Sequence, residues 1–249
     1  MKYSKRSIPA LIFFLFPAIS FSQSFTGYST NSILLKSNIR SKSVLLSNVL
    51  TNRVADLSPL IGVAAWEDSG KQYEARSIIQ FDYKQLPTAI VENPDLIESA
   101  ELILYPNQLV ETNGQPFTLL VERVLEPWTD SLTTWFNQPA TQWYNEIKIS
   151  ASRANRVIRA DVTKMVRDMF KYGNYGFLFA CKDPNETDIS QWFASPKNDD
   201  NQMRPELMIR YVRPYKVPYN TDFVLSQVQQ QQRQLDNIPP PVATQPAKK

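Results

Sequence analysis

The stretch that decides the fold is Glu206-Leu207-Met208-Ile209-Arg210-Tyr211. In an extended strand, Leu207, Ile209 and Tyr211 fall on one face, and the other three residues fall on the opposite face. A period of two with an apolar side predicts a strand that covers a hydrophobic core. We therefore expect the apolar set to face inward.

Nine further short runs are rich in Val, Ile, Leu, Phe and Tyr and are separated by turn-forming clusters. They are residues 32–36, 43–47, 59–65, 76–81, 99–104, 117–123, 156–160, 175–181 and 191–194. Ten short strands without a βα alternation are typical of two packed antiparallel sheets. The sequence thus predicts an all-β sandwich.

One segment shows a helical period instead. Asp161 is a suitable N-cap, and Gly173 a suitable C-terminal stop. Apolar side chains between them are spaced i, i+3, i+4, i+7 and i+8, at Val162, Met165, Val166, Met169 and Phe170. This spacing predicts one short amphipathic helix that covers one end of the core.

The N-terminus has the pattern of a secretory signal peptide over residues 1–22. Lys2, Lys5 and Arg6 precede an apolar run at residues 8–19, and Ser20-Phe21-Ser22 follows as a cleavage pattern. The run is short for a membrane span, and no later segment is apolar enough to cross a bilayer. We expect export to the cell surface or the extracellular space, with the periplasm as the alternative, and no membrane insertion after cleavage.

The rest of the chain divides into three parts. Residues 23–31 form a lead-in, residues 32–212 the β-sandwich domain, and residues 213–249 a Pro/Gln-rich tail. The tail has no core-forming pattern, so we expect most of it to be disordered. Two roles stay open for the tail: it is a tether, or it contacts a surface protein.

Charge and composition exclude several functions. The chain has 27 Lys and Arg against 24 Asp and Glu, so loss of the three basic leader residues balances the two signs. Nucleic-acid binding therefore has no compositional support. Histidine is absent, which removes serine- or cysteine-histidine catalysis and histidine-based zinc sites. The single cysteine, Cys181, lies in an apolar run and is interpreted as a buried structural thiol.

An ordered series of short motifs carries a resemblance to a known family. The motifs are Ala64-Ala65-Trp66, residues 76–82, Leu86-Pro87, residues 97–105, 121–124 and 128–139, Asp161-Val162-Thr163, residues 173–177, Phe193-Ala194-Ser195 and Arg204-Pro205-Glu206-Leu207. In this order and spacing the chain resembles the DNRLRE domain, also described as carbohydrate-binding module family 96, over about residues 32–211. The hexapeptide of the name is absent, and residues 200–205 agree with it at three positions.

The resemblance implies a jelly-roll-like sandwich that binds a polysaccharide reversibly and has no catalytic residues or cofactor. Some relatives bind acidic polysaccharides. A sugar site needs an exposed aromatic face and polar side chains that reach the hydroxyl groups. The aromatic candidates are Trp66, Trp143, Tyr144 and Trp192, and the basic candidates for an acidic glycan are Arg153, Arg156 and Arg159.

Other roles stay open for these residues and for the chain. Each aromatic ring could instead pack in the core or in a loop, and the arginines could form a solvated face. Acidic loops around residues 183–188 and 199–200 offer oxygen ligands for calcium, but their spacing matches no known loop, and no metal site is predicted. The alternative function is a structural or adhesive surface component that uses the sandwich for protein contacts. A glycan-active enzyme would need a carboxylate pair, and the sequence identifies none.

Overall fold

The structure is a computed structural model that describes residues 25–38, 40–54, 59–107, 117–151, 156–183, 188–217 and 229–230. The predicted signal peptide and most of the predicted tail lie outside these ranges. Residues 28–213 form one compact unit. Within the described chain, no helix is long and apolar enough to span a bilayer.

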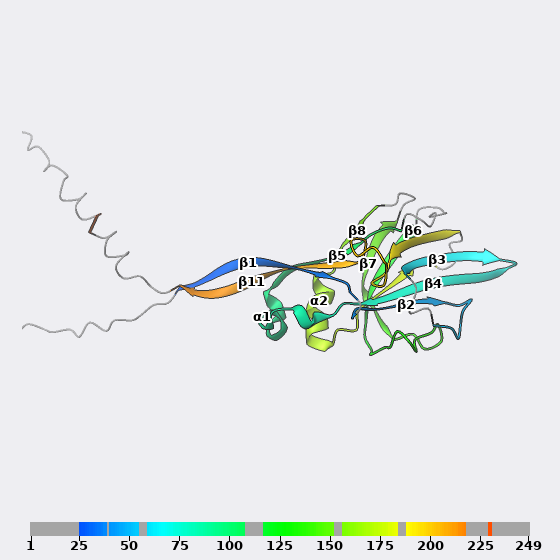
Figure 1. Cartoon of the computed structure of the whole chain (residues 1–249), viewed down its shortest axis with the longest axis horizontal. Helices are drawn as coiled ribbons and strands as arrows, with labels where there is room; N and C mark the ends of the chain where they lie inside the picture. Colours follow the sequence, from blue (N-terminus) through cyan, green and yellow to red (C-terminus); the bar gives the residue numbers. More distant parts are fainter. Residues whose placement is uncertain are drawn as a thin grey trace, which may run out of the picture. The chain divides into compact units, whose positions relative to one another are not determined.

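The smaller sheet has four strands (Figure 1). Their order is β1 (Phe25–Lys36), β11 (Glu206–Val217), β5 (Ile97–Leu104) and β8 (Ile158–Asp161). Strand β11 pairs antiparallel with β5, and Leu207 and Ile209 are fully buried, as their alternation predicts. Glu206 is also buried, and its carboxylate has partners there: Tyr105 Oη donates to it at 2.8 Å, and Lys36 pairs with it at 3.1 Å. β1 and β11 extend past the predicted domain limits at residues 32 and 212.

The larger sheet has seven strands, all paired antiparallel. The main order is β10 (Ile189–Ala194), β3 (Leu60–Asp68), β4 (Lys71–Gln80), β9 (Phe177–Cys181), β6 (Phe117–Val124) and β7 (Thr141–Ala151), and β2 (Lys42–Ser47) pairs with β4. All ten predicted strands are present, and β7 is an additional one. The β7 segment is central to the site described below.

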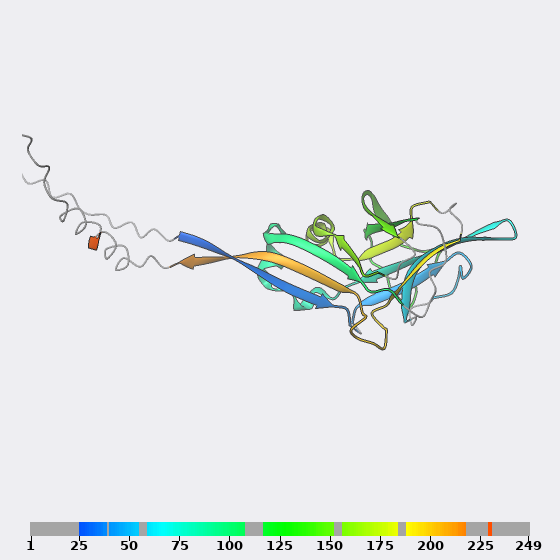
Figure 2. The same cartoon turned by 90° about the horizontal axis from the view of Figure 1, so that it is seen from above.

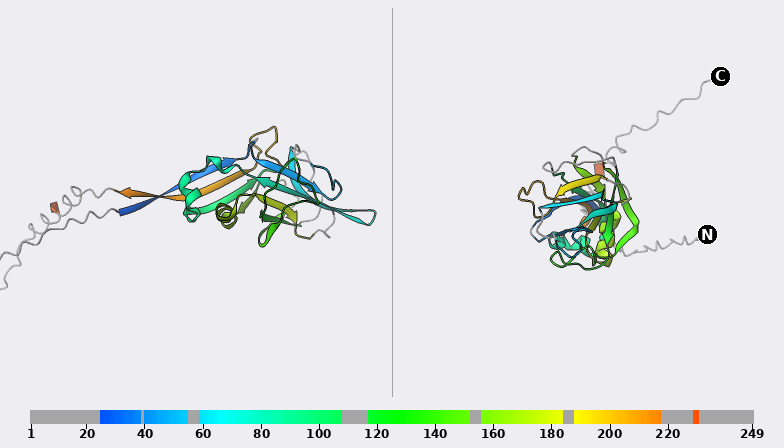
Figure 3. Two further views of the ribbon diagram at one scale, coloured as in Figure 1. Left: turned by 90° about the horizontal axis from the view of Figure 1, so that it is seen from below. Right: turned by 90° about the vertical axis from the view of Figure 1, so that its right-hand side faces the viewer.

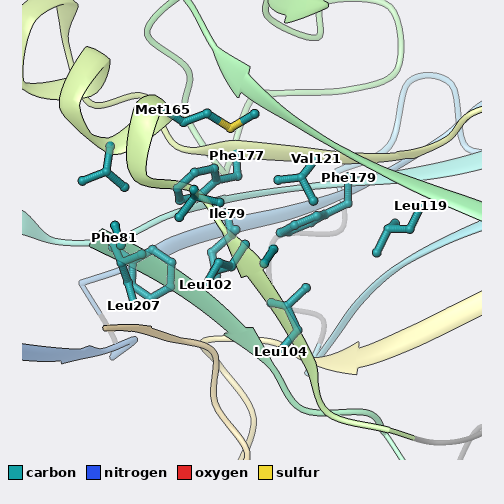
Figure 4. Close-up of a cluster of buried hydrophobic side chains, with 14 of the residues drawn as sticks. Ile79, Phe81, Leu102, Leu104, Leu119, Val121, Met165, Phe177, Phe179 and Leu207 are labelled. Carbon is teal, nitrogen blue, oxygen red and sulfur yellow. The ribbon is translucent and has the colours of Figure 1, made fainter. Parts of the chain in front are cut away.

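Side chains from both sheets meet in one core (Figure 4). Ile79, Phe177 and Phe179 come from the larger sheet, whereas Leu102 and Leu207 come from the smaller one. All five are fully buried or nearly so. The fold is therefore the all-β sandwich that the sequence predicts. The buried Cys181 belongs to the same core, in agreement with its interpretation as a structural thiol.

A second apolar cluster covers the outer face of the larger sheet. Val44, Ile78 and Leu178 lie in it, with the indole of Trp128 over them. Trp128 Nε1 donates to the Tyr175 carbonyl at 2.7 Å, which fixes the ring on the sheet. Because both faces of the sheet are covered here, strand β9 is buried at every position and has no alternation.

Helix α2 (Thr163–Tyr172) lies beside β5, as Figures 2 and 3 show. The backbone N–H of Val162, next to the helix, donates to Ala100 at 2.8 Å, and Met165, Val166 and Met169 are buried. Gly173 ends the helix with φ of 110°, as predicted. The start differs from the prediction: Asp161 ends strand β8, and Val162 is the N-cap residue. A second, shorter helix, α1 (Thr88–Glu92), was not predicted, and it lies between two 3-10 turns, η1 (Tyr83–Gln85) and η2 (Pro94–Leu96).

Candidate functional site

Strand β7 contains a wide bulge. Gln142 pairs with Arg123, and Ile147 pairs with Val121, so the four residues between them on β7 face only Glu122 on β6. Bulges bend a strand and redirect its side chains, and they are frequent at sheet edges near functional sites. β7 is such an edge strand, at the end of the order of the larger sheet. The bulge therefore redirects the side chains of residues 143–146 at this edge of the sheet.

Two adjacent aromatic side chains project from this bulge. Trp143 is 72% exposed and Tyr144 is 67% exposed. Their rings meet edge to face, with centroids 5.9 Å apart and an interplanar angle of 90°. Aromatic pairs favour this geometry, so the two rings support each other without being buried. Together they give an exposed, pre-organised apolar surface.

Tyr144 also forms one wall of a groove between β7 and the start of α2, with a volume of about 470 Å³. We call this the β7–α2 groove. Its remaining lining residues are 145–147 from β7 and Asp161, Val162, Thr163, Lys164, Met165 and Arg167 from the helix side. An aromatic wall beside polar side chains is the arrangement that suits a sugar ring with its apolar face and its hydroxyl groups.

The polar side chains of the groove are held in defined positions. Lys164 Nζ donates to Asn145 Oδ1 at 2.7 Å and thereby joins the two walls. The Asn145 Nδ2 group makes no hydrogen bond to the described part of the chain, so it can donate to a ligand. Arg167 donates from Nε to the Ile97 carbonyl at 3.0 Å and from Nη2 to the same oxygen, which commits it to the fold.

Asp161 supplies an ionised carboxylate at the edge of the groove. Its Oδ1 accepts hydrogen bonds from the hydroxyl and, at 2.9 Å, from the backbone N–H of Thr163. These two donors hold the pKa of the Asp161 carboxyl below its usual value. The carboxylate is therefore a hydrogen-bond acceptor at neutral pH and not a proton donor.

The other two aromatic candidates lie elsewhere in the sheet. Trp66 on β3 is partly buried and stacks on Tyr73, with centroids 5.4 Å apart. Trp192 on β10 is partly buried over Gly62, where a Cβ atom would lie 2.7 Å from its ring. Strands β3 and β7 are separated by β4, β9 and β6 in the order of the sheet. The structure brings Trp143 and Tyr144 together but separates them from Trp66 and Trp192 by strand order.

The arginine candidates are only partly described. Arg159 is exposed, and its Nη1 lies 2.6 Å from a carboxylate oxygen of Glu101 on the neighbouring strand, so its charge has a partner. Arg156 is exposed and has no ion pair with the described residues. Arg153 lies outside the described residues. As for metals, no group of three Asp, Glu or Cys side chains able to hold an ion occurs in the described ranges.

The sequence prediction missed the residues that support the bulge. Arg123 is only 5% exposed, and its Nε donates to Gln142 Oε1 at 2.8 Å. Its guanidinium carbon lies 5.8 Å from the centre of the Tyr172 ring. Within the described chain, no carboxylate pairs with this buried cation. The available signal was Arg123 in the largely apolar segment of β6, but the sequence gives no indication that β7 is its partner strand.

Comparison with known proteins assigns the family. The family model of carbohydrate-binding module family 96 matches residues 62–211, which is more than half of the chain. The chain belongs to carbohydrate-binding module family 96. The matched segment contains both walls of the β7–α2 groove and the Trp143–Tyr144 pair. A search of the curated proteins returned no match.

Proposed function

We propose that the protein binds a polysaccharide reversibly in the β7–α2 groove, with Trp143 and Tyr144 as the contact surface for sugar rings. The observation that carries this proposal is the bulge that leaves two consecutive aromatic side chains exposed beside a polar groove. Membership of a carbohydrate-binding family supports the same ligand class. An open groove of this kind is expected to bind in the micromolar to millimolar range, about 4 to 8 kcal/mol.

The polar groups of the groove match the hydroxyl groups of a sugar. Asn145 Nδ2 is a free donor, Asp161 is an acceptor, and Lys164 Nζ is a donor that already has a fixed direction. One acceptor and two donors around an aromatic wall could orient a hydroxyl-rich ring without requiring a charged ligand. We therefore expect this groove to accept neutral glycans.

We propose that the module does not cleave its ligand. Carbohydrate-binding modules are usually non-catalytic. Glycosidases of the two-carboxylate type need one carboxyl group with a raised pKa as the general acid. Thr163 lowers the pKa of Asp161, the best-placed carboxyl of the groove, and Glu146 is paired with Lys148 at 2.8 Å. Asp161 therefore does not suit the acid role, and the Glu146 carboxylate is engaged in an ion pair.

We also propose that the protein is exported. The charged start, the apolar run and the cleavage pattern of residues 1–22 support secretion, and a polysaccharide ligand fits an extracellular or cell-surface location. We propose that the part of the tail that follows β11, after residue 217, contacts a surface protein.

Affinity electrophoresis tests the proposed site. The protein would run through gels with dextran, xyloglucan, laminarin, polygalacturonate or alginate, and reducing ends would be assayed afterwards. We expect retardation without new reducing ends, and loss of at least tenfold in affinity for the retained neutral glycan in Trp143→Ala and Tyr144→Ala. Phe136→Ala is the matched control, because Phe136 is also 72% exposed but lies in the 128–139 loop. Unchanged retardation of both groove variants would refute the assignment.

A structural role is the second candidate, and one surface favours it. Leu132 and Phe136 are 68% and 72% exposed on a loop that internal hydrogen bonds hold in place, among them Thr134 N to Asn137 Oδ1 and Asn137 Nδ2 to the Leu132 carbonyl. Exposed apolar side chains on a rigid loop are suited to a protein contact. Absence of retardation on every glycan would favour this role.

A further inference from the structure

Strand β1 lies at the edge of the smaller sheet, beside β11 (Figure 2). Directly after β1, the Ser37 N–H donates to the Pro205 carbonyl at 2.9 Å. Eight residues earlier in the chain, Ser29 Oγ donates to the carbonyl of Arg213, which lies eight residues after Pro205, at 3.4 Å. The two strands are therefore antiparallel, and their register does not change between these contacts.

One side of β1 has unpaired backbone groups. Successive residues of a strand direct their N–H and C=O groups alternately to the neighbour on one side and to the neighbour on the other. Because Ser37 bonds to β11, the opposite side receives the backbone groups of the even-numbered residues, Tyr28, Thr30, Ser32, Leu34 and Lys36. All five are exposed, and no strand of the described chain pairs with β1 on that side.

The other three strands at the sheet edges are protected against pairing. Strand β8 has four residues, of which Arg159 and Asp161 are charged and exposed. Strand β7 contains the bulge. Strand β10 is covered by the segment after β5, where the Asn107 N–H donates to the Trp192 carbonyl at 3.0 Å. Short length, charge, bulges and covering segments all prevent an edge from pairing with another chain.

Strand β1 has none of these protections. It is twelve residues long, contains no proline, and has no charged residue before its last one, Lys36. The register of β11 with β5 ends at Tyr211, and β11 continues to Val217 with β1 as its neighbour in the described chain. A two-stranded ribbon is only marginally stable in water, and further strands stabilise it. A strand added at the free edge of β1 would therefore stabilise this part of the sheet.

The exposed side chains of β1 are complementary to a second copy of the same strand. Tyr28 and Leu34 are 66% and 43% exposed, lie on the same face, and have Asn31 midway between them. If two β1 strands pair antiparallel about Asn31, Tyr28 of each copy lies opposite Leu34 of the other. Pairs of an aromatic and an aliphatic side chain across strands are favourable. Lys36 lies five residues from the centre, so the two like charges do not meet.

We propose that the protein forms a symmetric dimer in which β1 pairs antiparallel with β1 of a second copy, centred on Asn31. The even-numbered backbone groups then bond between the copies, and the two smaller sheets become one continuous sheet. Such a two-fold contact is self-complementary. The tail fits this edge less well, because a strand that returned from Val217 beside β1 would be parallel to it, and parallel pairing is less stable and needs a long crossover.

Dimer formation adds to the proposed function without depending on it. A dimer has two β7–α2 grooves, so a polysaccharide that reaches both is held more tightly than by one groove. That gain rests on the proposed function, whereas the β1 contact requires no ligand. Dimer formation is therefore measured without glycan, and its failure would leave the proposed glycan site unaffected.

Asn31→Cys tests the centre of the pairing. Residues directly opposite in a non-hydrogen-bonded pair have Cα atoms about 4.5 Å apart, which permits a disulfide. Cys181, the single native cysteine, is buried. Under mild oxidation we expect Asn31→Cys to form a covalent dimer.

Ser29→Cys is the matched control, because position 29 is on the same face of β1. Its copies are four residues apart along the paired strands, about 13 Å, so no disulfide should form between them. Equal rates of cross-linking in the two variants would show random collision and overturn the proposal, and so would the absence of cross-linking in Asn31→Cys.

Charge substitutions test the affinity by sedimentation equilibrium. Thr30 of one copy lies opposite Ser32 of the other, and both residues are exposed. Thr30→Glu/Ser32→Glu places like charges opposite each other twice, so we expect the dissociation constant of the dimer to rise about tenfold. Thr30→Lys/Ser32→Glu is the matched control, because opposite charges then meet and the affinity should stay near wild type.

Two results would contradict the dimer. Equal weakening in the two double variants would overturn the pairing about Asn31. A monomer mass for the unmodified protein at every concentration up to about 1 mM would overturn the contact altogether.

Discussion

Arg123 Nε lies 2.8 Å from Gln142 Oε1, and this buried hydrogen bond ends the regular pairing of β6 with β7 immediately before the bulge. Both side chains are at most 5% exposed. The bond gives the buried guanidinium an acceptor and at the same time anchors the residue before Trp143. The exposed aromatic pair therefore depends on a contact beneath it.

Gln142→Leu should destabilise the fold and weaken glycan binding. It leaves Arg123 Nε buried without an acceptor, which costs about 2 kcal/mol. Urea unfolding measures the loss, and affinity electrophoresis measures the effect on the Trp143–Tyr144 pair. Gln142→Glu keeps an acceptor and adds an opposite charge, so we expect it to retain both properties. A wild-type urea midpoint in Gln142→Leu would contradict the anchoring role.

Two glycines with positive φ should respond differently to a methyl group. A Cβ atom on Gly176, where φ is 88°, would overlap the carbonyl oxygen of Ile79, whereas one on Gly70, where φ is 76°, meets nothing within 4 Å. Gly70→Ala carries only the backbone strain, about 1 kcal/mol. Gly176→Ala adds a clash between adjacent strands and should cost at least about 3 kcal/mol. Similar urea midpoints for the two variants would contradict this reading.

Regular alternation and helical spacing were sufficient to predict most of the fold. Leu207 and Ile209 alternate with polar neighbours, and Val162 to Phe170 follow a helical spacing, so both elements were identified. Strand β7 was missed because its bulge breaks the period of two, and Trp143 and Tyr144 are both exposed although they are adjacent. Tertiary structure overrides local pattern at such a position.

The site was harder to predict than the fold. Exposed aromatic residues could be proposed from type, which identified Trp143 and Tyr144, but the same reasoning selected Trp66 and Trp192, which the larger sheet places on other strands. Pairing across the fold determines the groove: Asn145 and Lys164 come together from a strand and a helix. The spacing of Asn145 and Lys164 along the chain does not indicate that their side chains are in contact.

Acid should destabilise the start of α2 through protonation of Asp161. Because its pKa is lowered in the folded state, its contribution to stability is present above the unfolded value of about 3.9 and is lost as pH falls through the folded value. Thr163→Val removes the donating hydroxyl and should move the pKa of Asp161 back up, whereas Thr163→Ser should keep it low. A carboxyl-detected NMR titration measures the pKa of Asp161 in each variant. Identical titration in the two variants would refute the role of the hydroxyl.

Two tryptophans should separate structural from ligand-binding roles. Trp128 is 6% exposed and its Nε1 donates to the Tyr175 carbonyl, so Trp128→Phe leaves a polar group unpaired under the 128–139 loop and should cost about 2 kcal/mol. Trp143 is exposed, and Trp143→Phe should change the free energy of unfolding by less than about 0.5 kcal/mol. Glycan retention should show the opposite order, near wild type for Trp128→Phe and reduced for Trp143→Phe. Paired urea unfolding and affinity electrophoresis test both, and a stable Trp128→Phe variant that no longer binds glycan would move the ligand site to the outer face of the larger sheet.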